Sequence, residues 1–362
     1  MAAALRLAHK GYYTTDPNPR VGCVVVKDNQ LVASGWHEVT GGAHAEANAI
    51  DSVSIPAGAD FFVTLEPCSH HGRTPPCVDA VIAQRPRRVI VAMQDPNPQV
   101  CGRGLQKLRD QGIEVVCGVL EAEARQLNRG FCKRMQQGLP FVSLKMAASL
   151  DGRSALANGA SQWITGPAAR RDVQFLRAQS SAILSSARTV IEDDARLTVR
   201  LTSQELGQAG EVRQPLRAIV DADLSLTGSE ALFDKGGAIL VYTLSDNVKR
   251  ISRLQAAGAE VVPIVAETPT HLDMLAVLQD LAARGVNQLH CECGQKLAGG
   301  LIQRGLVDQL IIYMAPHLLG SQAQGLFELG ELSDLQQRKQ CHIDDVRIIG
   351  EDLRLSLTLE NS

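Results

Sequence analysis

The sequence contains no apolar run long enough to span a bilayer and no cluster of Lys and Arg long enough to form a basic track. Its most basic segment, Arg85-Pro86-Arg87-Arg88, is short and leads directly into an apolar run. With a net charge of −3, the chain lacks the positive face on which polynucleotide binding depends. These absences predict that neither a membrane nor a nucleic acid is a partner.

A secretion signal and a disulfide pattern are also missing. Residues 1–10 have helical spacing, but no apolar core with a cleavage site follows them, so no signal peptide is predicted. The nine cysteines are odd in number and scattered through apolar stretches such as 21–26 and 115–119. Free thiols in a reducing compartment explain this better than disulfides do, and we expect a cytoplasmic protein.

The length of 362 residues exceeds what one hydrophobic core usually fills, so two domains are expected. Strand-like and helix-like runs alternate in the first part, which predicts helices covering a mostly parallel sheet. The expected strands are 21–26, 61–66, 88–93 and 114–119, and the expected helices are 45–52, 77–84, 104–111 and 121–134.

A polar segment with Gly138 and Pro140 interrupts this alternation, and we place the domain boundary there, between 1–139 and 140–362. The second part repeats the α/β pattern, with a polar loop at 202–214. Its expected strands are 141–146, 182–185, 217–221, 238–242, 261–265, 288–293 and 309–314, its expected helices are 168–178, 272–283 and 297–303, and a hairpin is expected around Gly350.

One three-part motif carries chemistry: His44-Ala45-Glu46, then Pro67-Cys68, then Cys77. One imidazole and two thiolates form a three-ligand set that suits Zn²⁺ and leaves a fourth position open for water. His44 and Cys77 each open a predicted helix, where the positive pole of the helix favours thiolate. Glu46 is placed to shuttle protons in hydrolytic deamination.

Each of these residues alone also fits an ordinary role: a core histidine, a surface glutamate or a buried thiol. A purely structural zinc site is a second alternative, since His70 or His71 offers a fourth ligand. The joint spacing favours the catalytic interpretation.

Longer sequence strings around this motif indicate a particular family and not only a type of chemistry. The string from Thr64 to Cys77, TLEPCSHHGRTPPC, closely resembles the bifunctional riboflavin-biosynthesis deaminase/reductases, and so do DPNPRVG at 16–22 and MQDPNP at 93–98. In the second half, SLDGR at 149–153, SQWIT at 161–165 and LTVR at 197–200 match as well. The resemblance covers nearly the whole chain.

The resemblance implies an α/β fold with an N-terminal cytidine-deaminase-like three-layer domain and a C-terminal dihydrofolate-reductase-like domain. It implies deamination of 2,5-diamino-6-(5-phosphoribosylamino)pyrimidin-4-one and then NADPH-dependent reduction of the ribosyl group of 5-amino-6-(5-phosphoribosylamino)uracil to ribityl. Zn²⁺ and NADPH would be the cofactors, the substrate a phosphorylated pyrimidine, and the enzyme a homo-oligomer.

Eight residues separate Cys68 from Cys77, whereas cytidine-type and tRNA adenosine deaminases have only two at this place. The insert contains His70 and Arg73, which suit a ribosyl phosphate. By resemblance Asn18 also binds the substrate, although turn preferences alone explain an Asn in a Pro-rich loop.

In the second half, the resemblance assigns Ser161, Arg177, Leu197, Arg200 and Glu292 to the phosphoribosyl substrate. Arginine suits phosphate because its planar guanidinium offers paired donors. The dinucleotide is assigned to Ala147, Trp163, Thr189, Asp193, Gly294, Gln295, Lys296, Leu297, Ala298, Gly299 and Gly300, the last seven joining a strand to a helix where backbone N–H groups can hold phosphate. Lys145 is expected to act near the sugar carbonyl. Each of three residues also has an alternative structural role: Arg177 could lie on a solvated helix face, Trp163 in the core and Lys145 at a strand edge.

Two departures from the family pattern stand out: Ala195 replaces the usual proline, and Cys291 and Cys293 flank Glu292. Neither removes a predicted zinc ligand or Glu46. The rival functions are a nucleoside or tRNA zinc deaminase with an inactive second domain, and a zinc-stabilised module that binds pyrimidine nucleotides without turnover.

Overall fold

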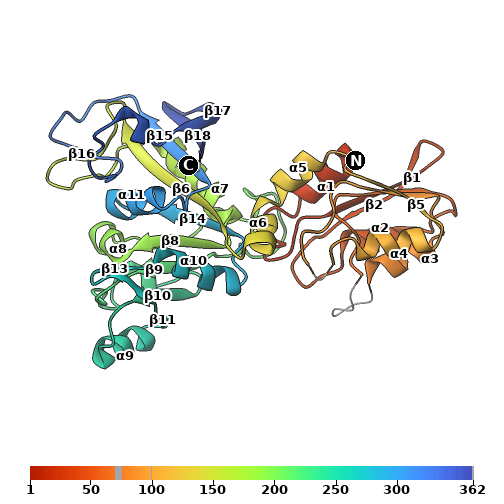
Figure 1. The fold of residues 1–362 in the computed structure, drawn as a ribbon, viewed down its shortest axis with the longest axis horizontal. Helices are drawn as coiled ribbons and strands as arrows, with labels where there is room; N and C mark the ends of the chain where they lie inside the picture. The colour runs from red at the N-terminus through yellow and green to blue at the C-terminus, as the bar shows by residue number, and fades with distance from the viewer. Residues whose placement is uncertain (70–75, 99, 361–362) are drawn as a thin grey trace. The chain divides into compact units, whose positions relative to one another are not determined.

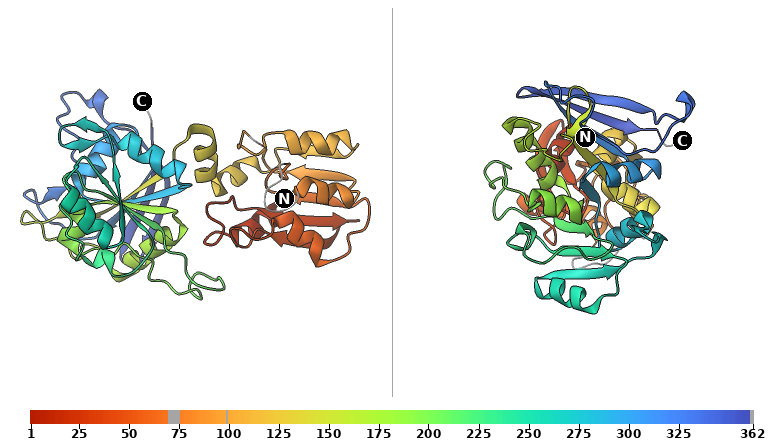
Figure 2. Two further views of the ribbon diagram at one scale, coloured as in Figure 1. Left: turned by 90° about the horizontal axis from the view of Figure 1, so that it is seen from below. Right: turned by 90° about the vertical axis from the view of Figure 1, so that its left-hand side faces the viewer.

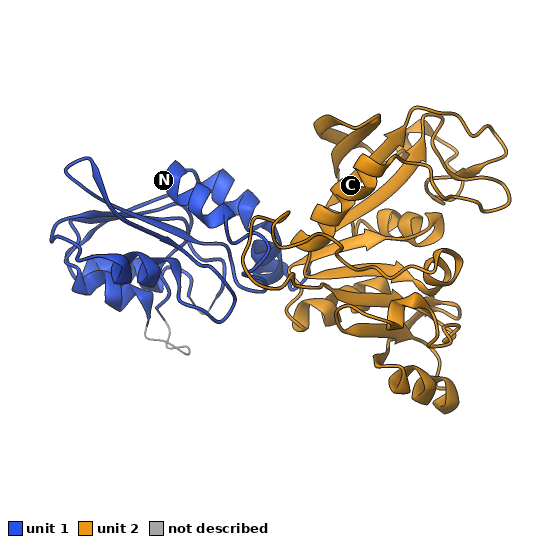
Figure 3. Ribbon diagram, turned by 180° about the vertical axis from the view of Figure 1, so that it is seen from behind, with its two compact units in different colours: residues 1–139 blue, residues 140–362 orange. Residues whose placement is uncertain are grey.

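Gly138 ends the last helix before the expected boundary, because its φ of 68° is a left-handed conformation that glycine adopts without strain. The computed structural model describes residues 1–69, 76–98 and 100–360. It divides into unit 1, Met1–Leu139, and unit 2, Pro140–Ser362 (Figure 3).

Unit 1 is built on a five-stranded sheet of order β2-β1-β3-β4-β5 (Figure 1). Its strands are β1 Gly22–Lys27, β2 Gln30–Trp36, β3 Asp60–Val63, β4 Arg88–Val91 and β5 Glu114–Cys117. Its helices are α1 Ala2–His9, α2 Ala45–Ser52, α3 Cys77–Ala83, α4 Arg103–Asp110, α5 Glu121–Leu127 and α6 Arg129–Gln137.

Alternate strand residues face two separate cores, which is what the two-residue period of a strand dictates. Val25, Phe61 and Val89 pack with α2, α3 and α4 on one face of the sheet. Residues of α1, α5 and α6 pack with Leu65 and Met93 in a second cluster. Unit 1 is therefore a three-layer α/β/α domain.

Two expectations for unit 1 are wrong. The sheet is mixed rather than mostly parallel, since β1 is antiparallel to both of its neighbours, β2 and β3, and only the pairs β3–β4 and β4–β5 are parallel. The helix expected over 121–134 is two helices that break at Asn128. The cause of the break is a long-range contact of the Asn128 side chain, described below.

Unit 2 contains a nine-stranded sheet of order β11-β10-β9-β8-β14-β6-β15-β18-β17, whose strands fan out in the left view of Figure 2. The strands are β6 Phe141–Ser149, β8 Ala182–Ser186, β9 Leu216–Val220, β10 Ile239–Thr243, β11 Ala259–Pro263, β14 Gln288–Glu292, β15 Gln309–Ala315, β17 Cys341–Ile349 and β18 Asp352–Leu359. From β11 to β15 the neighbours are parallel, and β18 and β17 add an antiparallel edge.

The helices of unit 2 are α7 Pro167–Gln179, α8 Ala187–Asp193, α9 Val248–Ala256, α10 Met274–Ala283 and α11 Gln295–Gln303, with short 3-10 turns η1 Ala231–Phe233 and η2 Leu335–Gln337. Two small hairpins pair β7 Arg153–Ala155 with β16 Gln324–Gly325 and β12 Ala266–Thr268 with β13 His271–Leu272. Helices α8 and α9 were not predicted from the sequence, although Ser186 and Asn247 cap them through their side chains.

Candidate functional site

The three predicted metal ligands come from separate elements of unit 1 and converge. His44 is the N-cap of α2, Cys77 is the first residue of α3, and Cys68 follows β3. His44 Nδ1 lies 3.2 Å from Cys77 Sγ and 3.6 Å from Cys68 Sγ. The ligand atoms all lie within 4.8 Å of one another, the only such group of three or more among the described residues.

The two thiol groups are hydrogen-bonded to each other, and this bond shifts their pKa values in opposite directions. A hydrogen bond from Cys77 lowers the pKa of Cys68 to about 4, and the same bond raises the pKa of Cys77. The backbone N–H of Cys77 also donates to Cys68 Sγ at 3.2 Å. A cation of two positive charges fits this group, because it can replace the thiol protons and hold both sulfurs as thiolates beside the imidazole.

Glu46 lies in the first turn of α2, one residue beyond Ala45, and is 3% exposed. Burial is the main reason that its pKa is raised to about 7. A carboxyl group of that pKa beside the ligand cluster can accept and return a proton near neutral pH.

The Glu66 carboxylate fixes the backbone near Cys68 through hydrogen bonds. Its carboxylate accepts four backbone hydrogen bonds, from Asp95 and Gly102 at Oε2 and from Gly104 and Leu105 at Oε1. A β-carbon at Gly104 would lie 2.2 Å from the carbonyl oxygen of Pro67, so only glycine permits this approach. The start of α4 is thereby held against the residue before Cys68.

Asn18 lies next to His37, a buried residue that sequence reasoning missed. Asn18 Nδ2 is 3.1 Å from His37 Nε2, and His37 Nδ1 is 2.9 Å from the Ala43 carbonyl, one residue before His44. The sequence did offer one indication of a role for His37: it precedes the predicted ligand His44 by seven positions, in an H-x-x-x-x-x-x-H pattern. The expected substrate contacts His70 and Arg73 lie outside the described residues.

The loop that bears Asn18 is anchored through Arg20. The Arg20 N–H donates to Asn128 Oδ1 at 2.8 Å, and Asn128 Nδ2 donates to the Arg20 carbonyl at 2.9 Å. The Arg20 guanidinium also donates to the carbonyl of Leu127, the last residue of α5. These contacts fix Asn128 outside helical geometry, which explains why α5 and α6 are separate.

Unit 2 has a cavity of about 990 Å³ at the carboxyl ends of β8 and β14, where ligands of parallel sheets usually bind. Twelve of the predicted residues line it: Lys145, Ala147, Ser161, Trp163, Arg177, Thr189, Asp193, Leu197, Arg200, Glu292, Gly294 and Gln295.

The remaining predicted dinucleotide residues, Lys296, Leu297, Ala298, Gly299 and Gly300, belong to α11 and are not among the lining residues. Gly299 has a packing reason to be glycine, since a β-carbon there would lie 2.1 Å from the Glu328 carbonyl oxygen. Gly294 is the N-cap of α11, so the free backbone N–H groups of this helix begin at the cavity.

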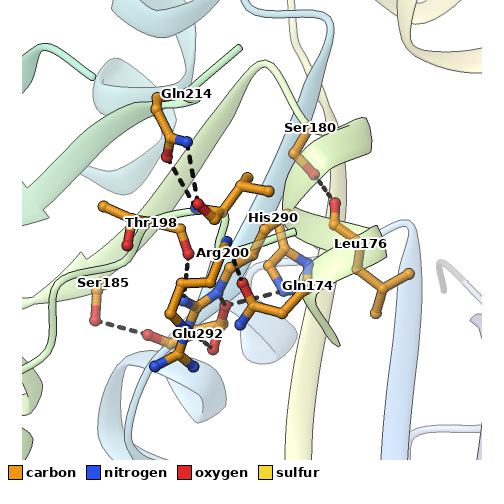
Figure 4. Close-up of polar contacts among 11 residues, drawn as sticks. Gln174, Leu176, Ser180, Ser185, Thr198, Arg200, Gln214, His290 and Glu292 are labelled. Atoms are coloured by element: carbon orange, nitrogen blue, oxygen red, sulfur yellow. Dashed lines mark hydrogen bonds and ion pairs between the residues drawn. The ribbon is translucent and has the colours of Figure 1, made fainter. Parts of the chain in front are cut away.

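Two of the lining residues, Arg177 and Glu292, form an ion pair, and Figure 4 shows the polar contacts around Glu292. Arg177 Nε and Nη2 donate to the two carboxylate oxygens of Glu292 at 2.5 and 2.9 Å. His290 Nε2 lies 3.3 Å from Glu292 Oε1, and Ser185 Oγ donates to the Glu292 carbonyl at 2.6 Å. Although burial opposes ionisation, Arg177 and His290 hold the pKa of Glu292 well below its usual range.

Lys145 projects from β6 into the same cavity. Burial lowers its pKa, and the nearby Arg177 acts in the same direction, whereas Glu292 and Asp193 oppose them. Trp163 is 67% exposed, which excludes the core position considered for it, and the Arg170 guanidinium lies 4.5 Å from its ring centroid.

Sequence reasoning missed several lining residues, including Arg170, Gln174, Arg188 and Thr198. Arg170, Gln174 and Arg177 follow i, i+4, i+7 spacing on α7, so one helix face delivers all three to the cavity. That spacing was the signal available in the sequence.

Comparisons with known proteins cover both units. The family profile "RibD C-terminal domain" matches residues 140–354, and "Cytidine and deoxycytidylate deaminase zinc-binding region" matches residues 1–93. The riboflavin biosynthesis protein RibD of Escherichia coli (strain K12) is 47% identical over 363 residues, which is 99% of this chain and 98% of the relative. RibD of Haemophilus influenzae is 43% identical and covers 99% of this chain and 96% of its own length.

Solved structures agree with these relatives. Acinetobacter baumannii RibD superposes with a TM-score of 0.90 at 39% identity, over 99% of this chain and 98% of that one. A diaminohydroxyphosphoribosylaminopyrimidine deaminase/5-amino-6-(5-phosphoribosylamino)uracil reductase from Thermotoga maritima has a TM-score of 0.85 at 33% identity, over 99% and 97% of the two chains. The expected fold class, a cytidine-deaminase-like domain followed by a dihydrofolate-reductase-like one, is confirmed.

Proposed function

Because this chain belongs to the RibD family of bifunctional riboflavin-biosynthesis enzymes, we propose that residues 1–139 hold its zinc-dependent deaminase and residues 140–362 its NADPH-dependent reductase. The enzyme removes the 2-amino group of 2,5-diamino-6-(5-phosphoribosylamino)pyrimidin-4-one by hydrolysis. It then reduces the ribosyl group of 5-amino-6-(5-phosphoribosylamino)uracil to a ribityl chain.

The convergence of His44, Cys68 and Cys77 beside a buried Glu46 is the single observation that supports the deaminase assignment best. In this proposal the three residues hold one Zn²⁺, which supplies the Lewis acidity that makes water nucleophilic near neutral pH. Glu46 accepts one proton of the attacking water and transfers it to the ring nitrogen, then transfers the second, hydroxyl proton of the adduct to the amine, which departs as ammonia while the carbonyl forms. Asn18, His70 and Arg73 bind the substrate.

In unit 2 we assign Ser161, Arg177, Leu197, Arg200 and Glu292 to the phosphoribosyl substrate. The dinucleotide contacts are Ala147, Trp163, Thr189, Asp193 and the segment from Gly294 to Gly300. NADPH supplies the hydride. Lys145, whose ammonium shares the cavity with Glu292, donates a proton near the reduced carbonyl.

The family match also argues against one of the rival functions. A nucleoside or tRNA deaminase with an inactive second domain would not share 47% identity with a RibD protein over both halves. The C-x-C pair at Cys291 and Cys293 has no further metal-ligand neighbours among the residues described, so no second metal is proposed there.

We further propose a cytoplasmic homo-oligomer that binds no nucleic acid. The net charge of −3 supports the last point. Edge strand β17 exposes Ile343, Val346 and Ile348 at 56%, 52% and 78%, and an exposed apolar edge favours pairing with a second copy. Across the residues that the structure describes, no helix has the length and apolarity to cross a membrane.

Two assays on the zinc-loaded full chain test the assignment. Ammonia release from the diaminopyrimidine measures the first step, and NADPH oxidation with the deaminated product measures the second. We expect both activities in one preparation. Folded, zinc-replete protein that binds the diaminopyrimidine without releasing ammonia would instead indicate a binding module.

A further inference from the structure

The arginines of the unit 2 cavity are not equivalent. Arg177 pairs with Glu292, Arg188 with Glu192 and Arg196 with Asp234. Among the described residues, the Arg200 guanidinium has no carboxylate partner and no hydrogen bond, and Arg170 donates only to the Thr165 carbonyl. Among these arginines, Arg200 and Arg170 are therefore the two whose charge no carboxylate partner offsets.

Arg200 reaches the cavity from an extended segment. Leu197 and Val199 are buried, whereas Thr198 is half-buried and Arg200 is exposed, which is the two-residue alternation of extended chain. Thr198 and Arg200 line the cavity together with Leu197. The segment begins at Leu197, whose φ of 53° is an unfavourable left-handed conformation for a branched residue. Such a conformation persists only where the surrounding contacts hold it.

Two glutamine side chains hold the backbone of the residues that follow, Val199 and Arg200 (Figure 4). Gln174 Oε1 accepts the Arg200 N–H at 2.9 Å. Gln214 Oε1 accepts the Val199 N–H at 2.9 Å, and its Nε2 donates to the Val199 carbonyl at 3.1 Å. The Arg177 Nη1 completes the set with a bond to the Thr198 carbonyl at 3.0 Å.

We propose that Gln174 and Gln214 are positioning residues for Arg200, the guanidinium that supplies the net positive charge for the substrate's phosphomonoester. Arg177 already gives its paired donors to Glu292, whose carboxylate offsets its charge. A phosphate near Arg200 gains a charge-assisted contact without breaking an existing one. This inference rests on the proposed reductase function of unit 2.

The test uses steady-state kinetics of the reductase step in the full chain, together with competitive inhibition by ribose 5-phosphate and by ribose. For Arg200→Gln we expect the KM of the phosphorylated substrate and the Ki of ribose 5-phosphate to rise roughly 10- to 100-fold, the range of a charged hydrogen bond. For Gln174→Leu and Gln214→Leu we expect about a 5-fold rise, with the KM of NADPH and the inhibition by ribose unchanged.

Three further variants separate positioning from general damage. Gln214→Glu keeps the acceptor for the Val199 N–H and should restore part of the affinity. Gln204→Leu makes the same change as Gln214→Leu on an exposed residue of the neighbouring loop and should have no effect. In the Arg200→Gln background, Gln174→Leu should add almost nothing, because it acts through Arg200.

Wild-type protein that does not reduce the deaminated substrate would overturn the proposed function itself. If the wild type is active, an unchanged KM in the folded glutamine variants would overturn only the positioning role. A rise confined to the KM of NADPH in Arg200→Gln would place the cofactor's 2′-phosphate at this arginine and would also overturn the proposal. If Gln174→Leu does not fold, the Gln214 pair still decides.

Discussion

The side-chain amide of Asn128 forms two hydrogen bonds with the backbone of Arg20, a residue 108 positions earlier in the chain. Asn128 is 1% exposed, so water cannot replace either bond. Because the Arg20 backbone continues directly into the loop of Asn18, the junction of α5 and α6 determines where that loop lies.

Asn128→Asp replaces the Nδ2 donor with an oxygen that faces the Arg20 carbonyl. We expect a loss of about 1–3 kcal/mol in the free energy of unfolding of unit 1, the cost of an unsatisfied buried group. The KM of the deaminase should rise while the zinc content stays unchanged. Urea unfolding and deaminase kinetics measure this, and Asn247→Asp, at an exposed N-cap whose acceptor Asp retains, is the control. Unchanged stability and KM would contradict the positioning role.

Glu46→Gln removes the proton acceptor but leaves the three proposed metal ligands intact. We expect full zinc occupancy and a deamination rate lower by about 10²–10⁴-fold, the usual contribution of a general acid–base group. Reduction of the deaminated product should continue at the wild-type rate, because Glu46 belongs to unit 1. Metal analysis and the two separate assays check this. Loss of both activities in folded protein would refute the division of labour between the units.

The lowered pKa of Lys145 predicts the pH dependence of the reductase. Burial disfavours the ammonium, so Lys145 loses its proton at a lower pH than the 10.5 of an ordinary lysine. The rate of a step that needs the ammonium is highest at low pH, where Lys145 is protonated, and declines as the pH rises through this lowered pKa. Reductase kcat/KM should show that decline, and Lys145→Met should lower the rate by about 10²–10⁴-fold and leave a residual rate without the alkaline limb.

Lys249→Met, a change of an exposed lysine on α9, is the matched control and should leave the pH profile unaltered. An alkaline limb that persists in Lys145→Met would assign the titration to another group.

Removing one partner of the Arg177–Glu292 ion pair should lower the free energy of unfolding more than replacing both partners does. Arg177→Met leaves a carboxylate with only 14% of its side chain exposed, and we expect a loss of about 3 kcal/mol in the stability of unit 2. The double variant Arg177→Met/Glu292→Gln should recover part of this loss, because no uncompensated charge remains. Denaturant unfolding measures both. Equal losses in the single and double variants would show that the charge of Glu292 is not the cause.

The zinc motif could be predicted because its parts coincide with local features. His44 and Cys77 lie at the starts of helices, and Cys68 follows the buried strand β3. These helix starts and the end of the strand bring the three residues together. Gln174 and Gln214 could not be predicted in the same way. They act through backbone atoms of residues 199 and 200, and no sequence pattern records which carbonyl or N–H a side chain reaches.

Long-range contacts explain the errors in the fold as well. The periodicity of 121–134 continues through Asn128, and only its bonds to Arg20 interrupt the helix. Helix α9 was missed because Leu254 is its one buried residue, which leaves little apolar periodicity to detect.

Substitution of Gly104 should impair the deaminase, although Gly104 is not a catalytic residue. Any side chain there must displace either the first turn of α4 or the peptide unit leading into Cys68. A Gly104→Ala protein that retains its overall fold would therefore show its defect as poor metal retention. A screen that scores folding alone would pass such an allele as benign.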